Sequence, residues 1–230
     1  MNRIVRRVHP RLSLRGLSGI ELLIAVAGLF VSFPFIEPLT TGPLLESILF
    51  SIVLISAVLA IAGRGPVLIT AGLLALPTLA ARWINYYWPN LLPPEVFLIG
   101  GILFVFFVIA NLLRFVLTAP SVNTEVLCAS VSAYLLLALL WTLAYWLVAE
   151  LIPGAFAFNV SAAADKSIEG FNGLYFSLIT LCTVGYGDIT PVSGVARMLA
   201  AMEAMTGLLY IAVLIARLVA LNVAPKSDGS

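Results

Sequence analysis

The segment 183–188, with the sequence TVGYGD, carries the residues whose types and spacing point most directly to chemistry. Its two glycines, Gly185 and Gly187, are separated by one residue, and glycine adopts backbone conformations that other residues avoid. Such a backbone can direct successive carbonyl oxygens toward one axis, where they replace the water around a cation. The segment is therefore predicted to coordinate a dehydrated cation through backbone oxygens.

The composition places this segment in a membrane protein. Hydrophobic residues make up 62% of the 230 residues and charged residues only 10%, with a mean hydropathy of +1.11. Because soluble chains contain about 25% charged residues, a soluble enzyme is excluded, and a net charge of +1 leaves no basic surface for nucleic acid. One histidine and two cysteines supply neither a metal cluster nor a disulfide framework. Cys128 and Cys182 lie in apolar runs and are expected to be buried.

Six segments are long and apolar enough to cross a bilayer, which takes about 20 helical residues. Runs rich in proline and glycine separate several of them, as at 63–66 and 89–94. The predicted spans are 18–35, 44–63, 66–84, 95–118, 123–151 and 195–223. The expected fold is thus an all-α membrane protein with six transmembrane helices.

The basic residues indicate how the spans are oriented. With both termini cytoplasmic, nine of the twelve lysines and arginines lie inside, as the positive-inside rule favours. The other three are Arg82, Lys166 and Arg197. Aromatic residues at 83 and 86–88 then lie at the outer interface, where amphipathic rings are enriched. We expect a multi-pass protein of the cell membrane with cytoplasmic termini.

Residues 152–194, between the last two spans, are too polar and too interrupted to cross the bilayer. They nevertheless contain an apolar stretch, 168–183, that is too short to span. Non-helical backbone is tolerated at membrane depth only where it is buried in protein or lines a water-filled cavity. The pattern predicts a re-entrant pore helix followed by a loop that lines a pore.

In this context TVGYGD resembles the selectivity filter of the potassium channel superfamily, since it follows a half-span helix and lies between two full spans. The resemblance implies K+ sites formed by the carbonyls of Thr183, Val184, Gly185 and Tyr186 and the Thr183 hydroxyl, with Gly187 completing the filter. Because the motif occurs once, it also implies a homotetramer around a fourfold axis. The expected partners are K+ ions in the filter and membrane lipids. No organic cofactor is expected.

The residues next to the filter depart from the well-known bacterial two-span channels. Tyr175 stands where a tryptophan often donates a hydrogen bond to the filter aspartate, here Asp188, and a phenol can do the same. Cys182 replaces a commoner threonine, and Ile179 stands where some channels have a glutamate. The filter-supporting residues inferred from the resemblance are Asp188, Tyr175, Thr180 and Cys182.

Two residues of the last span carry further expectations. Glu203 is an ionisable group inside the membrane, and we expect it to clamp the last helix to Thr180 or Ser177. Gly207 lies 19 residues after Asp188, where the family has a hinge glycine, although a small residue that permits close helix packing is an equal explanation.

The helix after Gly207 presents apolar residues at helical spacing, and by resemblance these line the inner mouth. A hydrophobic constriction can close a pore by dewetting, so Ile215 and Val219 are the expected inner gate. Arg217 is expected to reach lipid phosphate or a nearby carboxylate. The candidate gate-lining residues are Leu208, Ile211, Ile215 and Val219.

Six spans with a filter invite comparison with voltage-gated channels, whose fourth span carries repeated basic residues. Here the segment 95–118 has only Arg114, and 119–122 leaves little room for a linker helix. The expected organisation is a basic cytoplasmic segment 1–17, a four-span domain 18–118 without sensor charges, a pore domain 119–223 and a cytoplasmic tail 224–230.

The function expected from these features is passive, potassium-selective conduction without voltage gating, and no catalytic group is apparent. Carboxylates at the outer mouth are expected to attract cations: Glu150, Asp165, Glu169 and Asp188. The triplet 159–161 matches a glycosylation acceptor, but so short a match is given no weight. A weakly selective cation channel, or a membrane sensor or accessory subunit that binds a ligand or partner through its first four spans, remains as an alternative.

Overall fold

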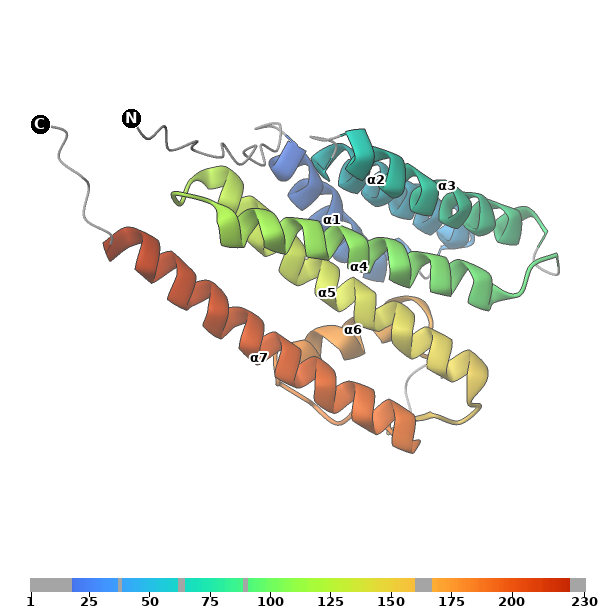
Figure 1. Cartoon of the computed structure of the whole chain (residues 1–230). Helices are drawn as coiled ribbons and strands as arrows, with labels where there is room; N and C mark the ends of the chain where they lie inside the picture. The colour runs from blue at the N-terminus through green and yellow to red at the C-terminus, as the bar shows by residue number, and fades with distance from the viewer. Residues whose placement is uncertain (1–17, 37–38, 62–64, 89–90, 160–166, 224–230) are drawn as a thin grey trace, which may run out of the picture.

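Seven helices and two short strands make up the part of the chain that the structure describes (Figure 1). The computed structural model describes residues 18–36, 39–61, 65–88, 91–159 and 167–223. The elements are α1 (Ser18–Ile36), α2 (Gly42–Ile61), α3 (Gly65–Tyr87), α4 (Pro94–Thr118), α5 (Thr124–Leu151), β1 (Phe156–Phe158), α6 (Gly170–Leu181), β2 (Ile189–Pro191) and α7 (Gly194–Val223). The chain is an all-α membrane protein apart from the two strands.

Six of the described helices are long and apolar enough to cross a membrane, and they coincide with the six predicted spans. Their bounds differ from the predicted ones by a few residues, as in α3, which continues to Tyr87. The remaining helix, α6, has 12 residues and is too short to cross. The predicted half-helix between the last two spans is therefore present.

Helix α5 lies between the first four spans and the pore elements (Figure 1). Helices α1 and α4 pack against it on one side, and α6 and α7 pack against it on the other. One continuous apolar core runs through α1 to α5, including Leu22, Val53, Leu112 and Leu136. The first four helices thus pack on α5 of their own chain through α1 and α4.

Small residues allow α4 to approach its neighbours on both sides. A Cβ atom at Gly100 would lie 2.8 Å from the Thr78 hydroxyl of α3, and one at Gly101 would lie 3.1 Å from Leu143 Cδ1 of α5. In a membrane, where lipid is as apolar as leucine, such close backbone packing is a main source of helix association. The glycine pair fixes α4 between α3 and α5.

The two strands were not foreseen from the sequence. They pair antiparallel, with Phe156 opposite Pro191, Ala157 opposite Thr190 and Phe158 opposite Ile189. Each strand has three residues, which is too short for an alternating pattern to be visible. The pair joins the segment before α6 to the segment after the filter.

A buried polar cluster joins α5, α6 and α7. Glu203 of α7 is fully buried, and its carboxylate accepts hydrogen bonds from Tyr145 of α5 and Ser177 of α6. The Ser177 hydroxyl also lies 2.8 Å from the Ala138 carbonyl oxygen. Glu203 therefore clamps the last helix to Ser177, as expected. Its second partner is Tyr145 rather than Thr180.

We predict that Glu203→Ala lowers the free energy of unfolding by about 1–3 kcal/mol, because it leaves the buried Tyr145 hydroxyl without its acceptor, whereas Ser177 can still donate to the Ala138 carbonyl oxygen. The measurement is the thermal unfolding midpoint of the purified protein in detergent. Glu21→Ala is the matched control, since Glu21 is exposed on α1 and its replacement should change the midpoint little. Equal midpoints for the two variants would show that the cluster contributes nothing to stability.

Candidate functional site

The backbone after α6 folds back onto the carbonyl end of that helix. The Ile179 carbonyl oxygen accepts from the N–H groups of both Val184, at 2.8 Å, and Gly185, at 3.2 Å. The Thr180 carbonyl oxygen accepts from the Thr183 N–H at 2.9 Å. The last carbonyls of a helix lack partners within the helix, and here the first residues of the TVGYGD segment supply them.

These hydrogen bonds determine which way the carbonyls of the segment point. A trans peptide is planar, with its N–H and C=O pointing in opposite directions, and the described residues contain no cis peptide bond. Because the N–H groups of Val184 and Gly185 point toward α6, the carbonyls of Thr183 and Val184 point away from it. They face the open side of the chain.

Along the segment, backbone conformations with positive φ alternate with conformations that have negative φ. Thr183, Gly185 and Gly187 have φ values of 57°, 54° and 81°, whereas Val184 and Tyr186 do not have positive φ. Alternation of left- and right-handed residues gathers successive N–H groups on one side, which leaves the carbonyls on the other. Thr183 is the single non-glycine residue with positive φ in the described ranges, and such strain in a β-branched residue is typical of a functional site.

The outer end of the segment is held by Asn159, which follows β1. Its side-chain Nδ2 donates to the Gly187 carbonyl oxygen at 2.7 Å, and its backbone N–H donates to the Asp188 carbonyl oxygen at 2.7 Å. A longer contact of 3.3 Å joins Nδ2 to the Thr190 hydroxyl. The carbonyls of Gly187 and Asp188 are therefore engaged by Asn159, so the row of unengaged carbonyls ends at Tyr186.

Tyr175 and Asp188 form the hydrogen bond that the resemblance led us to expect. The Tyr175 hydroxyl donates to Asp188 Oδ2 at 2.7 Å, and Asp188 Oδ1 accepts from the Ile189 N–H at 3.0 Å. Partial burial, with the Asp188 carboxylate, raises the pKa of Tyr175 to about 12. The hydroxyl consequently stays protonated near neutral pH and continues to donate.

Cys182 corrects one expectation. It ends α6, with its N–H donating to Leu178 O at 3.0 Å, but its side chain is exposed rather than buried, and Cys128 is only partly buried. The Cys182 sulfur lies 3.5 Å from the Tyr134 hydroxyl. Within one chain, no described element covers the Cys182 side chain or the segment 183–187 that follows it.

The apolar side chains of the segment are exposed in a single chain. Val184 is 51% exposed and Tyr186 is 72% exposed. Large apolar side chains that are exposed together indicate a surface that another element covers. The site of one chain therefore has an uncovered face.

Sequence reasoning missed two of the groups that hold the segment. The carbonyl of Ile179 was invisible because a backbone acceptor has no sequence signal. Asn159 was noticed only as part of a glycosylation triplet, and it lies 28 residues before Gly187, so no local pattern connects them.

The structure places Gly207 at the contact between α7 and α6. A Cβ atom there would collide with the Leu181 carbonyl oxygen and would lie 3.1 Å from Leu181 Cδ1. Glycine is thus required for the close packing of these two helices. The four candidate gate residues, Leu208, Ile211, Ile215 and Val219, are 58%, 42%, 56% and 56% exposed on α7.

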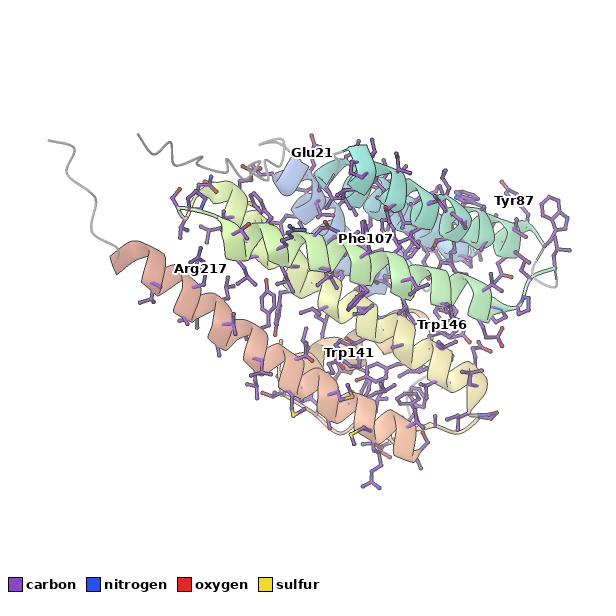
Figure 2. The ribbon with its side chains drawn as sticks, in the orientation of Figure 1. Glu21, Tyr87, Phe107, Trp141, Trp146 and Arg217 are labelled. Carbon is purple, nitrogen blue, oxygen red and sulfur yellow. The ribbon has the colours of Figure 1, made fainter. Side chains whose placement is uncertain are left out.

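Two arginines find partners inside the chain. Arg82 of α3 forms an ion pair with Glu46 of α2 at 3.4 Å. Arg217 of α7 faces the α4–α5 connection (Figure 2) and donates to the Ala119 carbonyl oxygen at 2.9 Å. Arg217 was expected to reach lipid or a carboxylate, but it contacts a backbone carbonyl because the short connection brings Ala119 within reach.

Fold and site together define an integral membrane protein with a re-entrant pore loop. A family model described as "Ion channel" matches residues 133–224, which include most of α5 and all of the site. Protein LctB of Geobacillus stearothermophilus is 35% identical over 112 residues, or 42% of this chain and 83% of that protein. The chain belongs to the potassium channel superfamily, whose members are ion channels rather than enzymes.

Other relatives share only the pore region. "Two pore potassium channel c" of Oryza sativa subsp. japonica is 32% identical over 87 residues, or 38% of this chain and 19% of that protein. "Two-pore potassium channel 3" of Arabidopsis thaliana is 44% identical over 48 residues, or 21% of this chain and 11% of that protein. The chain thus spans less than a fifth of the length of these plant proteins. No solved structure matches it.

We predict that Gly207→Ala lowers the thermal unfolding midpoint, because the added methyl group pushes α7 away from Leu181. Gly72→Ala is the matched control: nothing lies within 4 Å of its added methyl group, and alanine favours a helix by about 1 kcal/mol over glycine. The control should therefore be as stable as the original chain or more so. If both variants behave alike, Gly207 is not needed for packing, and a hinge role alone would explain it.

Proposed function

We propose that the chain is a passive, potassium-selective channel in which the carbonyls of Thr183, Val184, Gly185 and Tyr186 and the Thr183 hydroxyl hold dehydrated K+. The observation that carries the proposal is the geometry of the segment. Its first N–H groups are bonded to α6, so the carbonyls of Thr183 and Val184 point away from that helix, and its backbone alternates between left- and right-handed residues. Relatives that are named potassium channels support K+ as the ion.

Four copies are needed to enclose an ion, because one chain contributes a single strand of carbonyls. A cyclic homotetramer repeats one interface four times and closes on itself. The exposed Tyr186 and Val184, and exposed residues of α7 such as Met198, Met202 and Met205, supply the apolar surface for such an interface. In the assembly, the carbonyl ends of four α6 helices place negative dipole ends toward the pore, which favours a cation there.

The proposed domains are a four-span unit over 18–118 and a pore unit over 119–223, with a basic segment 1–17 and a tail 224–230. We place both termini in the cytoplasm and the protein in the cell membrane. In this proposal, carboxylates at the outer mouth of the pore attract cations. They belong to Glu150, Glu169 and Asp188. Asp165, and both terminal segments, lie outside the described residues.

The first four spans do not act as a voltage sensor in this proposal. Steep voltage dependence uses three or four charges per subunit, each contributing about 2.3 kcal/mol per 100 mV, whereas α4 contains Arg114 alone. Arg82 forms an ion pair with Glu46, so its charge joins α3 to α2. Gating then arises from the pore domain itself or from a ligand.

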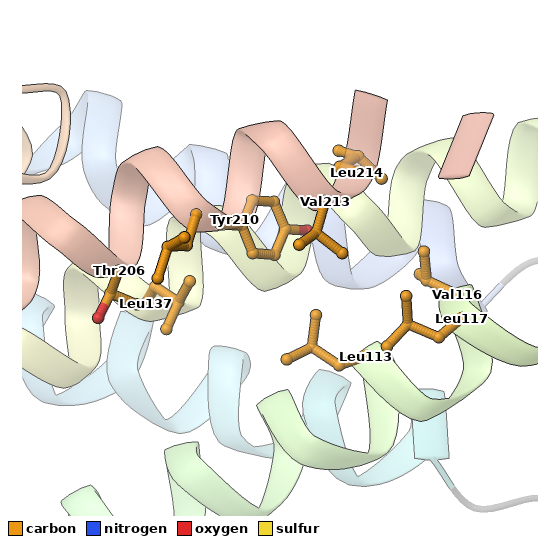
Figure 3. A pocket seen from close by; sticks show the side chains of 9 residues that line it. Leu113, Val116, Leu117, Leu137, Thr206, Tyr210, Val213 and Leu214 are labelled. Carbon is orange, nitrogen blue, oxygen red and sulfur yellow. The ribbon is translucent and has the colours of Figure 1, made fainter. Parts of the chain in front are cut away.

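A cavity borders the inner half of α7, which is also joined to its neighbours: the Tyr210 hydroxyl donates to the Ser130 carbonyl oxygen of α5, and Arg217 donates to that of Ala119. Beyond Gly207, a cavity of about 290 Å³ separates α7 from α4 and α5 (Figure 3). It is lined almost entirely by apolar side chains, including Leu113, Leu137 and Val213. Glu203 holds α7 just before Gly207, so a bend at Gly207 that breaks the Tyr210 and Arg217 hydrogen bonds would move Leu208, Ile211, Ile215 and Val219. Ile215 and Val219 form the constriction in this proposal.

We predict K+ flux from liposomes that contain the purified protein, with Na+ flux at least tenfold lower. Gly185→Ala should abolish the flux, because alanine disfavours the positive φ of 54° at this position. Gly194→Ala is the control, since Gly194 has open space around it and no positive φ, and it should conduct normally. Equal K+ and Na+ flux would indicate a weakly selective channel. Absence of flux from protein that is verified to be a monomer would favour a membrane sensor or accessory subunit.

We predict that Ile215→Asn raises the resting K+ flux several-fold, because a polar side chain stabilises water in a hydrophobic constriction. The same substitution at Ile69, which is 66% exposed on α3, controls for a polar group introduced on another span. The flux assay in liposomes measures both. An unchanged resting flux in Ile215→Asn would remove Ile215 from the gate.

A further inference from the structure

The carbonyl of Gly187, the last glycine of the segment 183–188, has one hydrogen-bond partner among the described residues. Asn159 Nδ2 donates to this oxygen at 2.7 Å. Gly187 has a φ of 81°, and no atom beyond its chain neighbours lies within 4 Å of a Cβ added to it. Because glycine also has the widest conformational freedom, the orientation of this peptide depends on the contact with Asn159.

Asp188, the next residue, is held by several contacts. Its carbonyl oxygen accepts from the Asn159 backbone N–H at 2.7 Å. Its carboxylate accepts from the Tyr175 hydroxyl at 2.7 Å and from the Ile189 N–H at 3.0 Å. None of these bonds uses the Asn159 side chain. Removal of that side chain therefore leaves Asp188 in place and releases the Gly187 carbonyl alone.

The β1–β2 pair brings Asn159 to this position. Phe158 pairs with Ile189, so the next antiparallel pair is Asn159 with Asp188, and their backbone hydrogen bond continues the ladder. The pair is anchored in the core, because the Phe156 ring packs edge-on against aromatic rings of both α5 and α6, with centres 5.7 Å apart in each case. The amide of Asn159 is thus presented by a fixed frame.

The surroundings of this amide require its NH2 group at the Gly187 carbonyl. A carbonyl oxygen can only accept a hydrogen bond, so the NH2 group and not the amide oxygen faces it. A second contact from Nδ2 reaches the Thr190 hydroxyl at 3.3 Å. A carboxylate at position 159 has the same shape but no N–H to donate, so aspartate cannot replace the contact.

We propose that Asn159 is a specificity-determining residue of the filter, because it withholds the Gly187 carbonyl from the ions and leaves the Tyr186 carbonyl as the outermost of the row. Asn159 acts through the Gly187 peptide and is therefore a positioning residue. The inference rests on the filter proposed above. Ion preference depends on the fit of the ion or on the number of coordinating carbonyls, and both change when a mobile carbonyl joins the row.

The experiment is calorimetric titration of the purified full chain in detergent with K+ and, separately, with Na+, in N-methyl-D-glucamine chloride. The measured quantity is the ratio of the Na+ and K+ dissociation constants. Asn159→Ala and Asn159→Asp both remove the donor, and we expect each to lower the ratio by about fivefold. The negative charge of Asn159→Asp attracts both cations alike, so it does not change the ratio.

Asn172→Ala is the matched control. The Asn172 Nδ2 also donates to a backbone carbonyl oxygen, that of Ser167, at 2.9 Å, but this bond does not touch the segment 183–188. We expect its ratio to stay within about twofold of the original. Thermal unfolding midpoints and elution volumes of all variants separate a loss of stability or assembly from a change of ion preference. Either Asn159 variant is sufficient if the other does not fold.

Two results would overturn the inference while the filter proposal stands. The first is an unchanged ratio in a folded Asn159 variant, even with a lower unfolding midpoint, because Asn159 would then be structural only. The second is an equal fall of the ratio in Asn172→Ala, which would show that any loosening of the loop has this effect. Absence of K+ preference in the original protein would instead refute the filter itself, and this inference with it.

Discussion

Every backbone polar group at membrane depth needs a partner, and the geometry of the segment 183–188 follows from peptides whose N–H groups are bonded to α6 while their carbonyls are not. The N–H groups of Val184 and Gly185 are bonded to the Ile179 carbonyl. Their own peptide carbonyls are left facing outward, where only a cation or water can satisfy them. The short helix α6 makes this possible, because the end of a helix supplies the unpaired carbonyls that anchor the strand.

The rest of the pore domain holds this strand at both ends. At the inner side, Glu203 joins α5, α6 and α7 through Tyr145 and Ser177, and Gly207 lets α7 contact the end of α6. At the outer side, the β1–β2 pair brings Asn159 onto the carbonyls of Gly187 and Asp188. The segment that carries positive φ at Thr183 is bonded directly to α6 and Asn159, and α5 and α7 hold α6 in place, which is how local strain persists in a folded protein.

Sequence reasoning recovered what rests on composition and local spacing. Six apolar stretches gave the six spanning helices, a short stretch gave α6, and the TVGYGD motif indicated the site. It failed where the cause is distant in the chain. Asn159 and Gly187 are 28 residues apart, Arg217 and Ala119 are 98 residues apart, and the exposure of Cys182 depends on what covers one chain. No periodicity or motif carries such information, because it is created by folding.

The position of the first four spans constrains how they can influence the pore. Helices α1 and α4 pack on α5 of the same chain, and the connection from α4 to α5 is only a few residues long. The first four helices are therefore coupled to α6 and α7 in three ways: by packing on α5, by the contact of α1 with α6, and by the hydrogen bond from Arg217 to Ala119 in that connection.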